Sequence, residues 1–273
     1  MSKTLVIILN HNLPEITDDL YHELEKYKDD SYDLRVMDNG SREEFTSVHT
    51  SIRYEENLFW GGALNKAFDL LLQNDHYDSL LFLNNDIEVN GEIFVKSLRK
   101  ELFDNKYAIV SPCISGKALP WKQMQNWGGK SVREVKWIDN QAPLIHRKLV
   151  EAIGQFDENL YHGWGQELIC FDVCQKNNWK IGVCDFISIV HFKKQTFEQG
   201  RLFSLEKKAI ASKDSTKKAV SHQDYQAKFR ASYFEYFAQN PPQFDSFENL
   251  VSYGNNYSFN PIKAKSGRWF NRG

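Results

Sequence analysis

Short apolar runs rich in β-branched residues alternate with amphipathic stretches over the first 115 residues of the chain. The runs predict strands at residues 4–10, 32–41, 51–57, 79–86 and 107–114. The stretches between them predict helices at residues 13–30, 62–75 and 91–104. This alternation predicts an α/β fold with a mostly parallel sheet and helices on both of its faces.

Beyond residue 115 the rhythm of the sequence changes. Residues 117–139 carry three tryptophans around a Gly-Gly pair, which predicts a hairpin or a long loop. Helical stretches are predicted at 147–159 and 165–178, and an extended run at 179–192. The sequence beyond about residue 197 is polar and amphipathic, and residues 227–240 are its clearest helix.

The composition is that of a folded protein without an electrostatic bias. Hydrophobic residues make up 41% of the 273 residues, which is enough for a full core. The formal net charge of −2 gives no basis for binding nucleic acid, so no nucleic-acid partner is expected. No apolar run approaches the roughly 20 residues of a membrane span.

The cysteines indicate a reducing compartment. Cys113, Cys170, Cys174 and Cys184 form no C-x-x-C pair, which favours buried, reduced thiols. We therefore expect a soluble, cytoplasmic protein. Peripheral association with the inner face of a membrane, through a membrane-protein partner, is left open, as is a homodimer.

Polar clusters follow three of the predicted strands. They are Asn10-His11-Asn12, Asp38-Asn39-Gly40-Ser41 and Asn84-Asn85-Asp86. In parallel α/β sheets, ligands bind beyond the carboxyl ends of the strands, where the strand order reverses. Three clusters rich in amides and acids therefore predict one shared ligand at this edge.

Two features of the first half predict contacts to a nucleotide. The Asp38 carboxylate can accept a hydrogen bond from a base N–H or a ribose hydroxyl, and the alternative is an Asx turn. Gly61 and Gly62 open the helix at 62–75, and a helix amino terminus with small residues favours a diphosphate. The segment is not a P-loop, because it lacks G-K-[ST].

Oxygen and imidazole groups predict a site for a hard divalent cation. Asp86 supplies one charge and Asn84 a neutral oxygen. His191, at the end of an extended run, adds an imidazole nitrogen, and this mixture suits Mn²⁺ or Mg²⁺ held jointly with a diphosphate. The alternative for His191 is a structural histidine within a strand.

One acidic residue is a candidate general base. Glu167 begins a predicted helix behind Gly163-Trp164-Gly165, and a carboxylate in that position can take a proton. The alternative is a favourable charge at a helix amino terminus. Trp164 can stack on the face of a sugar or fill the core.

Taken in order, these segments resemble the GT-A inverting glycosyltransferases of family 2, in particular its rhamnosyltransferase-like branch. The resemblance covers roughly residues 4–195. It lies in VIILNHN, VMDNGS, NLFWGGALNKA, LFLNNDIEV, WIDNQAPLIHRKLVEAIGQFDENLY, GWGQELICFDVC and SIVHF. The sequence departs from the family pattern at Asn84 in the D-x-D-type motif, at Gln166 and Ile169 in the acidic element, and at Phe59 and Ala67, which replace glycines.

The resemblance implies a division of the chain into domains. Residues 1–197 would form the GT-A glycosyltransferase domain, with a nucleotide-sugar-binding half at 1–115 and an acceptor-binding half at 116–197. Residues 198–273, which the resemblance does not cover, are predicted from their amphipathic pattern to form a helical C-terminal extension.

The resemblance also implies a role for each matched residue. The donor would contact Asn10, Asn12, Asp38, Asn57, Gly61, Gly62, Asn65, Asn84, Asn85 and Asp86. Asp86 and His191 would hold Mn²⁺ or Mg²⁺, and Glu167 would deprotonate the acceptor hydroxyl. Trp137, Trp164 and Asp172 would contact the acceptor.

The expected activity is transfer of a sugar, with inversion, from a nucleotide-diphosphate sugar of the UDP or dTDP type. The acceptor would be a hydroxyl of a saccharide, a glycan or a lipid-linked saccharide. A sugar-nucleotide nucleotidylyltransferase is an alternative, but it would need a Gly-rich basic loop where ILNHNLPEITDD is acidic and free of glycine. A non-catalytic partner that binds nucleotide-sugar or glycan is the second alternative.

Overall fold

The structure is a computed structural model, and it describes residues 2–115, 122–156 and 166–192. The predictions for Trp164, for the helix at 227–240 and for the extension at 198–273 lie outside these residues.

Nine strands of the described residues form one sheet. They are β1 (Lys3–Asn10), β2 (Tyr32–Asn39), β3 (Thr50–Tyr54), β4 (Tyr77–Asn84), β5 (Ile87–Glu88), β6 (Tyr107–Ser115), β7 (Val132–Val135), β8 (Leu144–His146) and β9 (Lys180–His191). The order is β3-β2-β1-β4-β8-β6-β9-β5, and β7 also pairs with β9. The order reverses between β1 and β4, because β1 has β2 on one side and β4 on the other.

Both parallel and antiparallel pairings occur in this sheet. Strand β1 is parallel to β2 and β4, β2 is parallel to β3, and β6 is parallel to β9. The mostly parallel α/β sheet predicted from the sequence is confirmed. One difference is β8, which lies antiparallel between β4 and β6. With three residues, β8 is too short to show a periodicity.

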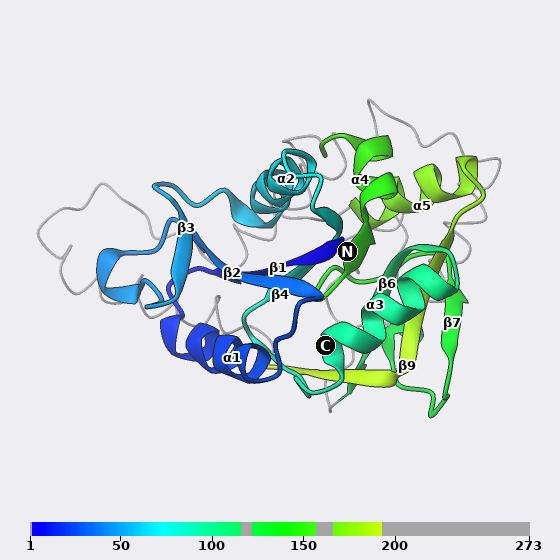
Figure 1. The fold of residues 1–273 in the computed structure, drawn as a ribbon, viewed down its shortest axis with the longest axis horizontal. Coiled ribbons are helices and arrows are strands. Elements are labelled where there is room, and N and C mark those ends of the chain that lie inside the picture. The colour runs from blue at the N-terminus through cyan, green and yellow to red at the C-terminus, as the bar shows by residue number, and fades with distance from the viewer. Residues whose placement is uncertain (1, 116–121, 157–165, 193–273) are drawn as a thin grey trace, which may run out of the picture.

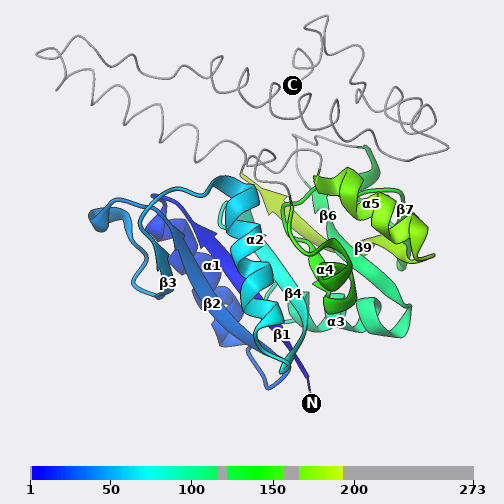
Figure 2. The ribbon, with the colours of Figure 1, turned by 90° about the horizontal axis from the view of Figure 1, so that it is seen from above.

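Helices cover both faces of the sheet, as predicted. They are α1 (Pro14–Lys26), α2 (Phe59–Leu72), α3 (Phe94–Asp104), α4 (Arg147–Ile153) and α5 (Gln166–Lys176), with single 3₁₀ turns η1 (Glu43–Phe45) and η2 (Lys122–Met124). In Figure 1, α1 and α3 lie on one face, and α2, α4 and α5 lie on the other. Figure 2 shows α2, α4 and α5 in front of the sheet. No helix of the described residues is long and apolar enough to span a membrane.

The central strands are buried on both faces. Leu5, Val6, Ile7 and Ile8 of β1 are all 0% exposed. A continuous apolar run without alternation is expected for a strand that has helices on both sides. Burial of this kind fixes the register of β1 and therefore the position of Asn10 at its carboxyl end.

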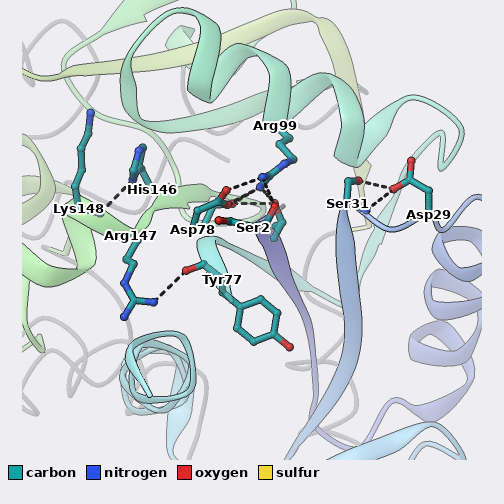
Figure 3. A network of polar contacts seen from close by, with 11 residues as sticks. Ser2, Asp29, Ser31, Tyr77, Asp78, Arg99, His146, Arg147 and Lys148 are labelled. Carbon is teal, nitrogen blue, oxygen red and sulfur yellow. Dashed lines mark hydrogen bonds and ion pairs between the residues drawn. The ribbon is translucent and has the colours of Figure 1, made fainter. Parts of the chain in front are cut away.

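Two arginines fasten the opposite, amino-terminal edge of the sheet (Figure 3). Arg99 donates to both carboxylate oxygens of Asp78, at 2.5 and 2.6 Å, and to the Ser2 carbonyl at 2.7 Å. Arg147 donates to the carbonyls of Leu71, Asn74 and Tyr77, each at 3.0 Å.

Arg147 acts as a cap on the end of α2. The last carbonyls of a helix have no partner within the helix, and a cation there stabilises it by about 0.3–1 kcal/mol. The edge far from the three polar clusters is therefore held by charged side chains.

Candidate active site

A chain of buried side chains joins the ends of β1, β2 and β4. Asn10 Nδ2 donates to Asp38 Oδ2 at 2.9 Å, and Thr17 Oγ1 donates to Asn10 Oδ1 at 2.9 Å. Asn85 Nδ2 donates to Thr17 Oγ1 at 2.9 Å. The three polar clusters of the sequence therefore lie at one edge, as the parallel arrangement requires.

Asp38 is more deeply buried than a nucleotide contact needs to be. It is 0% exposed, and its second oxygen accepts the Ser41 backbone N–H at 3.0 Å. This is the geometry of the Asx turn given above as the alternative. The carboxylate has no exposed surface, so a base could reach it only if neighbouring side chains moved, and the base contact stays a prediction.

His11 organises the loops around this edge, a role that only its position beside Asn10 could have indicated from the sequence. Its Nδ1 lies 2.9 Å from the Asn39 carbonyl, and its Nε2 lies 3.1 Å from Asn12 Nδ2 and 3.2 Å from Asn57 Nδ2. Because two amide groups donate to Nε2, the ring is neutral with its proton on Nδ1. Burial lowers the pKa of His11 below 6.5, and the bond to the Asn39 carbonyl opposes this shift.

Two asparagines hold the beginning of α2. Asn57 Oδ1 accepts the Phe59 N–H at 2.7 Å, and Asn39 Oδ1 accepts the Leu58 N–H at 2.8 Å. The helix starts at Phe59, three residues before the predicted start at residue 62, so Gly61 and Gly62 lie in its first turn. The φ angle of Phe59 is +56°, a left-handed conformation at the position where the family pattern has glycine.

Asn65, a predicted donor contact, is occupied by the backbone of another segment. Its Nδ2 donates to the Phe156 carbonyl at 2.8 Å, and its Oδ1 accepts the Phe156 N–H at 2.9 Å. The side chain is 7% exposed. It therefore joins α2 to the end of the segment that follows α4, and a contact with the donor stays a prediction.

Asp86 and His191 are brought together by the pairing of β5 with β9. Ile87 pairs with His191, and the Phe192 N–H donates to the Asp86 carbonyl at 2.9 Å. His191 Nε2 lies 3.2 Å from Asp86 Oδ1, and the two side chains are 13% and 10% exposed. His191 Nδ1 is buried and has no hydrogen-bond partner within the described ranges.

This pair fits a divalent cation that is shared with a bound molecule. A carboxylate oxygen and an imidazole nitrogen are ligands that Mn²⁺ accepts, and they lie close enough to bind one ion. No group of three or more His, Cys, Asp and Glu side chains within residues 2–115, 122–156 and 166–192 could hold a metal by itself. The remaining ligands would come from a diphosphate and water.

Glu167, the predicted general base, and Asp172, a predicted acceptor contact, both lie on α5. Glu167 lies in the first turn of α5, and α5 leads through residues 177–179 into β9. The beginning of α5 therefore lies toward the same edge of the sheet as the carboxyl end of β9 (Figure 2). Asp172 forms an ion pair with Lys176 at 2.7 Å.

The Trp137 side chain does not offer the exposed ring face on which an acceptor sugar would stack. It is 4% exposed and belongs to the hydrophobic core. Its ring therefore packs as a core residue. Trp127, on the same predicted loop, is 55% exposed, and the Arg133 guanidinium lies 4.0 Å from the centre of its ring.

Two glutamines near this edge were missed by the sequence reasoning. Gln141 lies three residues ahead of Leu144, the first residue of β8, and its backbone carbonyl accepts the Asn84 N–H at 3.0 Å. Gln123 lies in η2 and is 2% exposed. Neither residue belongs to a periodic element, so only their position within the segments 117–139 and 137–161 could have drawn attention to them.

Neither a protein-family model nor a curated protein sequence matches the chain. The solved structures that match its fold include GalNAc-T7 and TarS. GalNAc-T7 with UDP, GalNAc and Mn²⁺ has a TM-score of 0.56 and 14% identity, over 70% of this chain and 44% of its own. Residues 1–349 of TarS from S. aureus give 0.54 and 16%, over 93% of this chain and 78% of their own. Both are GT-A glycosyltransferases, so the chain has the GT-A fold.

Proposed function

We propose, from the GT-A fold and the edge just described, that the protein is an inverting glycosyltransferase. It would move a sugar from a nucleotide-diphosphate sugar of the UDP or dTDP type to a hydroxyl of a saccharide or glycan. Support for the donor class comes from the likeness to GalNAc-T7, which was solved with UDP and Mn²⁺. Residues 1–115 would bind the donor, and residues 116–197 the acceptor.

The observation that carries the proposal is the meeting of Asp86 and His191. Their side chains come from different strands and lie 3.2 Å apart, at the carboxyl edge of a fold that binds ligands there. His191 Nδ1 is buried without a partner in the described part of the chain, which a purely structural histidine would avoid. Mn²⁺ or Mg²⁺ on these two residues would neutralise charge on the departing diphosphate.

The beginning of α2 also supports the proposed binding of a nucleotide diphosphate. Its first backbone N–H groups are not used within the helix, and Asn39 and Asn57 hold this end in place. Gly61 is buried there and carries no side chain that would keep a ligand away. The chain would thus receive the diphosphate between the start of α2 and Asp86.

Glu167 is the proposed general base. A sugar hydroxyl is a weak nucleophile, so a carboxylate must take its proton as it attacks the anomeric carbon. Glu167 is the acidic residue in the first turn of α5. Attack from the face opposite the diphosphate would invert the anomeric centre.

The test is release of nucleoside diphosphate from a panel of UDP- and dTDP-sugars with Mn²⁺, in the presence and absence of saccharide acceptors. Release with at least one donor, and formation of a product of inverted configuration, is the expected result. Thermal stabilisation by UDP or dTDP without turnover of any donor would instead identify a non-catalytic binding protein. If the protein neither binds these nucleotides nor turns over any donor, both the glycosyltransferase and the binding-protein proposals are wrong.

A further inference from the structure

Two buried glutamines carry side-chain atoms that have no hydrogen-bond partner in the described part of the chain. Gln141 is 8% exposed and leaves its Oε1 unpaired, and Gln123 is 2% exposed and leaves both amide atoms unpaired. Buried amides without partners destabilise a fold, so most of them bond to protein, ordered water or ligand. An unpaired acceptor beside a candidate site is therefore evidence for a ligand group.

The position of Gln141 in the sheet narrows the choice of ligand group. Strand β8, which Gln141 precedes, lies between β4 and β6, and β9 follows β6. The proposed nucleotide contacts lie at the ends of β1, β2 and β4, whereas Asp86 and His191 meet at the end of β9. A donor that contacts both the nucleotide residues and the Asp86–His191 pair must pass the beginning of β8. Gln141 is held there by its backbone carbonyl, which accepts the Asn84 N–H at 3.0 Å.

The orientation of the Gln141 amide is fixed by its neighbour. Its Nε2 donates to Asp139 Oδ2 at 3.0 Å, and the Asp139 backbone N–H is 3.4 Å from Met124 Sδ. A carboxylate accepts only from the nitrogen, so the amide cannot be turned round. The unpaired atom is therefore an oxygen, and its complement is an O–H or N–H donor.

We propose that Gln141 determines sugar specificity, with its Oε1 accepting a hydrogen bond from a hydroxyl of the sugar that is transferred. The inference rests on the proposed function, because it needs a nucleotide-sugar at this edge. A site built to pair a hydroxyl rejects an analogue that lacks it, since the protein group is then left unpaired. The bond would thus distinguish one donor sugar from another without affecting the nucleotide.

The first experiment compares Gln141→Met, which removes the acceptor at similar length, with Gln73→Met as a matched control. Gln73 is exposed and follows α2 at the far edge of the sheet. Dissociation constants are measured by calorimetry with Mn²⁺ for UDP, dTDP and their sugar conjugates. In Gln141→Met the affinity for the preferred sugar conjugate should fall by about tenfold or more, with the affinity for the free nucleotide unchanged. Equal effects on conjugate and free nucleotide would overturn the proposal.

The second experiment uses the unaltered protein, so it does not depend on the folding of a variant. Monodeoxy analogues of the preferred donor are compared with the parent donor, and one of them should lose about the same factor as Gln141→Met. In Gln141→Met, the parent donor and this analogue should bind with equal affinity. The variant has already lost the hydrogen bond that the analogue cannot make, so the second change has nothing left to remove.

The outcomes separate the two proposals. If every monodeoxy analogue binds like the parent, Gln141 Oε1 is satisfied by water and the specificity role is wrong, while the proposed function stands. If neither the free nucleotides nor their sugar conjugates bind, the proposed function fails and the role of Gln141 fails with it.

Discussion

Gly40 lies against the backbone of Asn57: a Cβ added to Gly40 would be 2.4 Å from the Asn57 nitrogen. The φ angle of Gly40 is +70°, so both space and conformation exclude a side chain. This contact presses the turn after β2 against the segment that leads into α2. It is a tight junction between two of the loops that form the candidate site.

Gly40→Ala should therefore destabilise the protein by more than about 2 kcal/mol, because conformational strain and a backbone clash add. Gly128→Ala is the matched control, since Gly128 has φ +72° but no atom within 4 Å of an added Cβ. The control should cost only about 1–2 kcal/mol. Urea unfolding of both variants checks the difference, and equal costs would contradict the clash.

The strained conformation of Phe59 predicts an inverted order of two substitutions. Alanine in a helix is normally more stable than glycine by about 1 kcal/mol. At φ +56°, however, glycine avoids the strain that alanine keeps, and both substitutions remove the same ring. Phe59→Gly should therefore unfold at a higher urea concentration than Phe59→Ala. The usual order, with alanine more stable, would show that the left-handed conformation is not populated.

The unfolding free energy should fall as the pH drops below 6.5. Burial lowers the pKa of both His11 and His146 in the folded protein. Each neutral ring accepts hydrogen bonds, His11 from the Asn57 amide and His146 from the Lys148 N–H. As pH falls, the unfolded chain takes up protons first, so stability is retained above 6.5 and is lost as the pH falls toward the folded pKa values.

Urea unfolding between pH 8 and pH 5 measures this dependence. Combining His11→Gln with His146→Gln should flatten the curve in that range, because no group with a lowered histidine pKa remains at these two positions. His76→Gln is the control, since His76 is exposed on the turn before β4. An unchanged slope in the double variant would assign the pH dependence to other groups.

Asp86→Ala should abolish metal-dependent binding of the donor. The substitution removes the carboxylate of the proposed ion-binding pair and leaves His191 alone. Calorimetry with UDP should show that Mn²⁺ no longer raises the affinity. Glu88→Ala, which removes an exposed carboxylate two residues away, should bind as the unaltered protein does. Unchanged affinity with Mn²⁺ in Asp86→Ala would contradict the assignment.

Glu167→Gln should keep the affinity for the donor and lower turnover by about 10²–10⁴-fold. The amide keeps the shape of the side chain but cannot take a proton from the acceptor. Glu134→Gln, which disrupts only an exposed ion pair with Lys180, should retain most of the activity. Near-normal turnover in Glu167→Gln would move the role of base to Asp157, Glu158 or Asp172.

The sequence predicted the fold well because its signals are long. Strands such as β1 and helices such as α2 have enough residues for a periodicity to show. The three-residue β8 and the two-residue β5 have no such pattern, although β5 is what brings Asp86 to His191.

The site was predicted less completely, for a different reason. A polar residue at a strand end can face a ligand or a neighbouring loop, and the sequence alone does not distinguish the two. Asp38 and Asn65 turned out to be bonded within the protein, to Ser41 and to Phe156. Gln141 was missed because its importance comes from an unpaired atom, and pairing is a property of the folded chain.

Helix α2 is fastened along its whole length before any ligand arrives. Asn39 and Asn57 hold its first turn, Asn65 fixes its middle, and Arg147 binds the carbonyls at its end. A helix held in this way needs no reorganisation to aim its free N–H groups at an anion. The entropic cost of ordering that surface is met during folding, so a diphosphate would encounter it already preorganised.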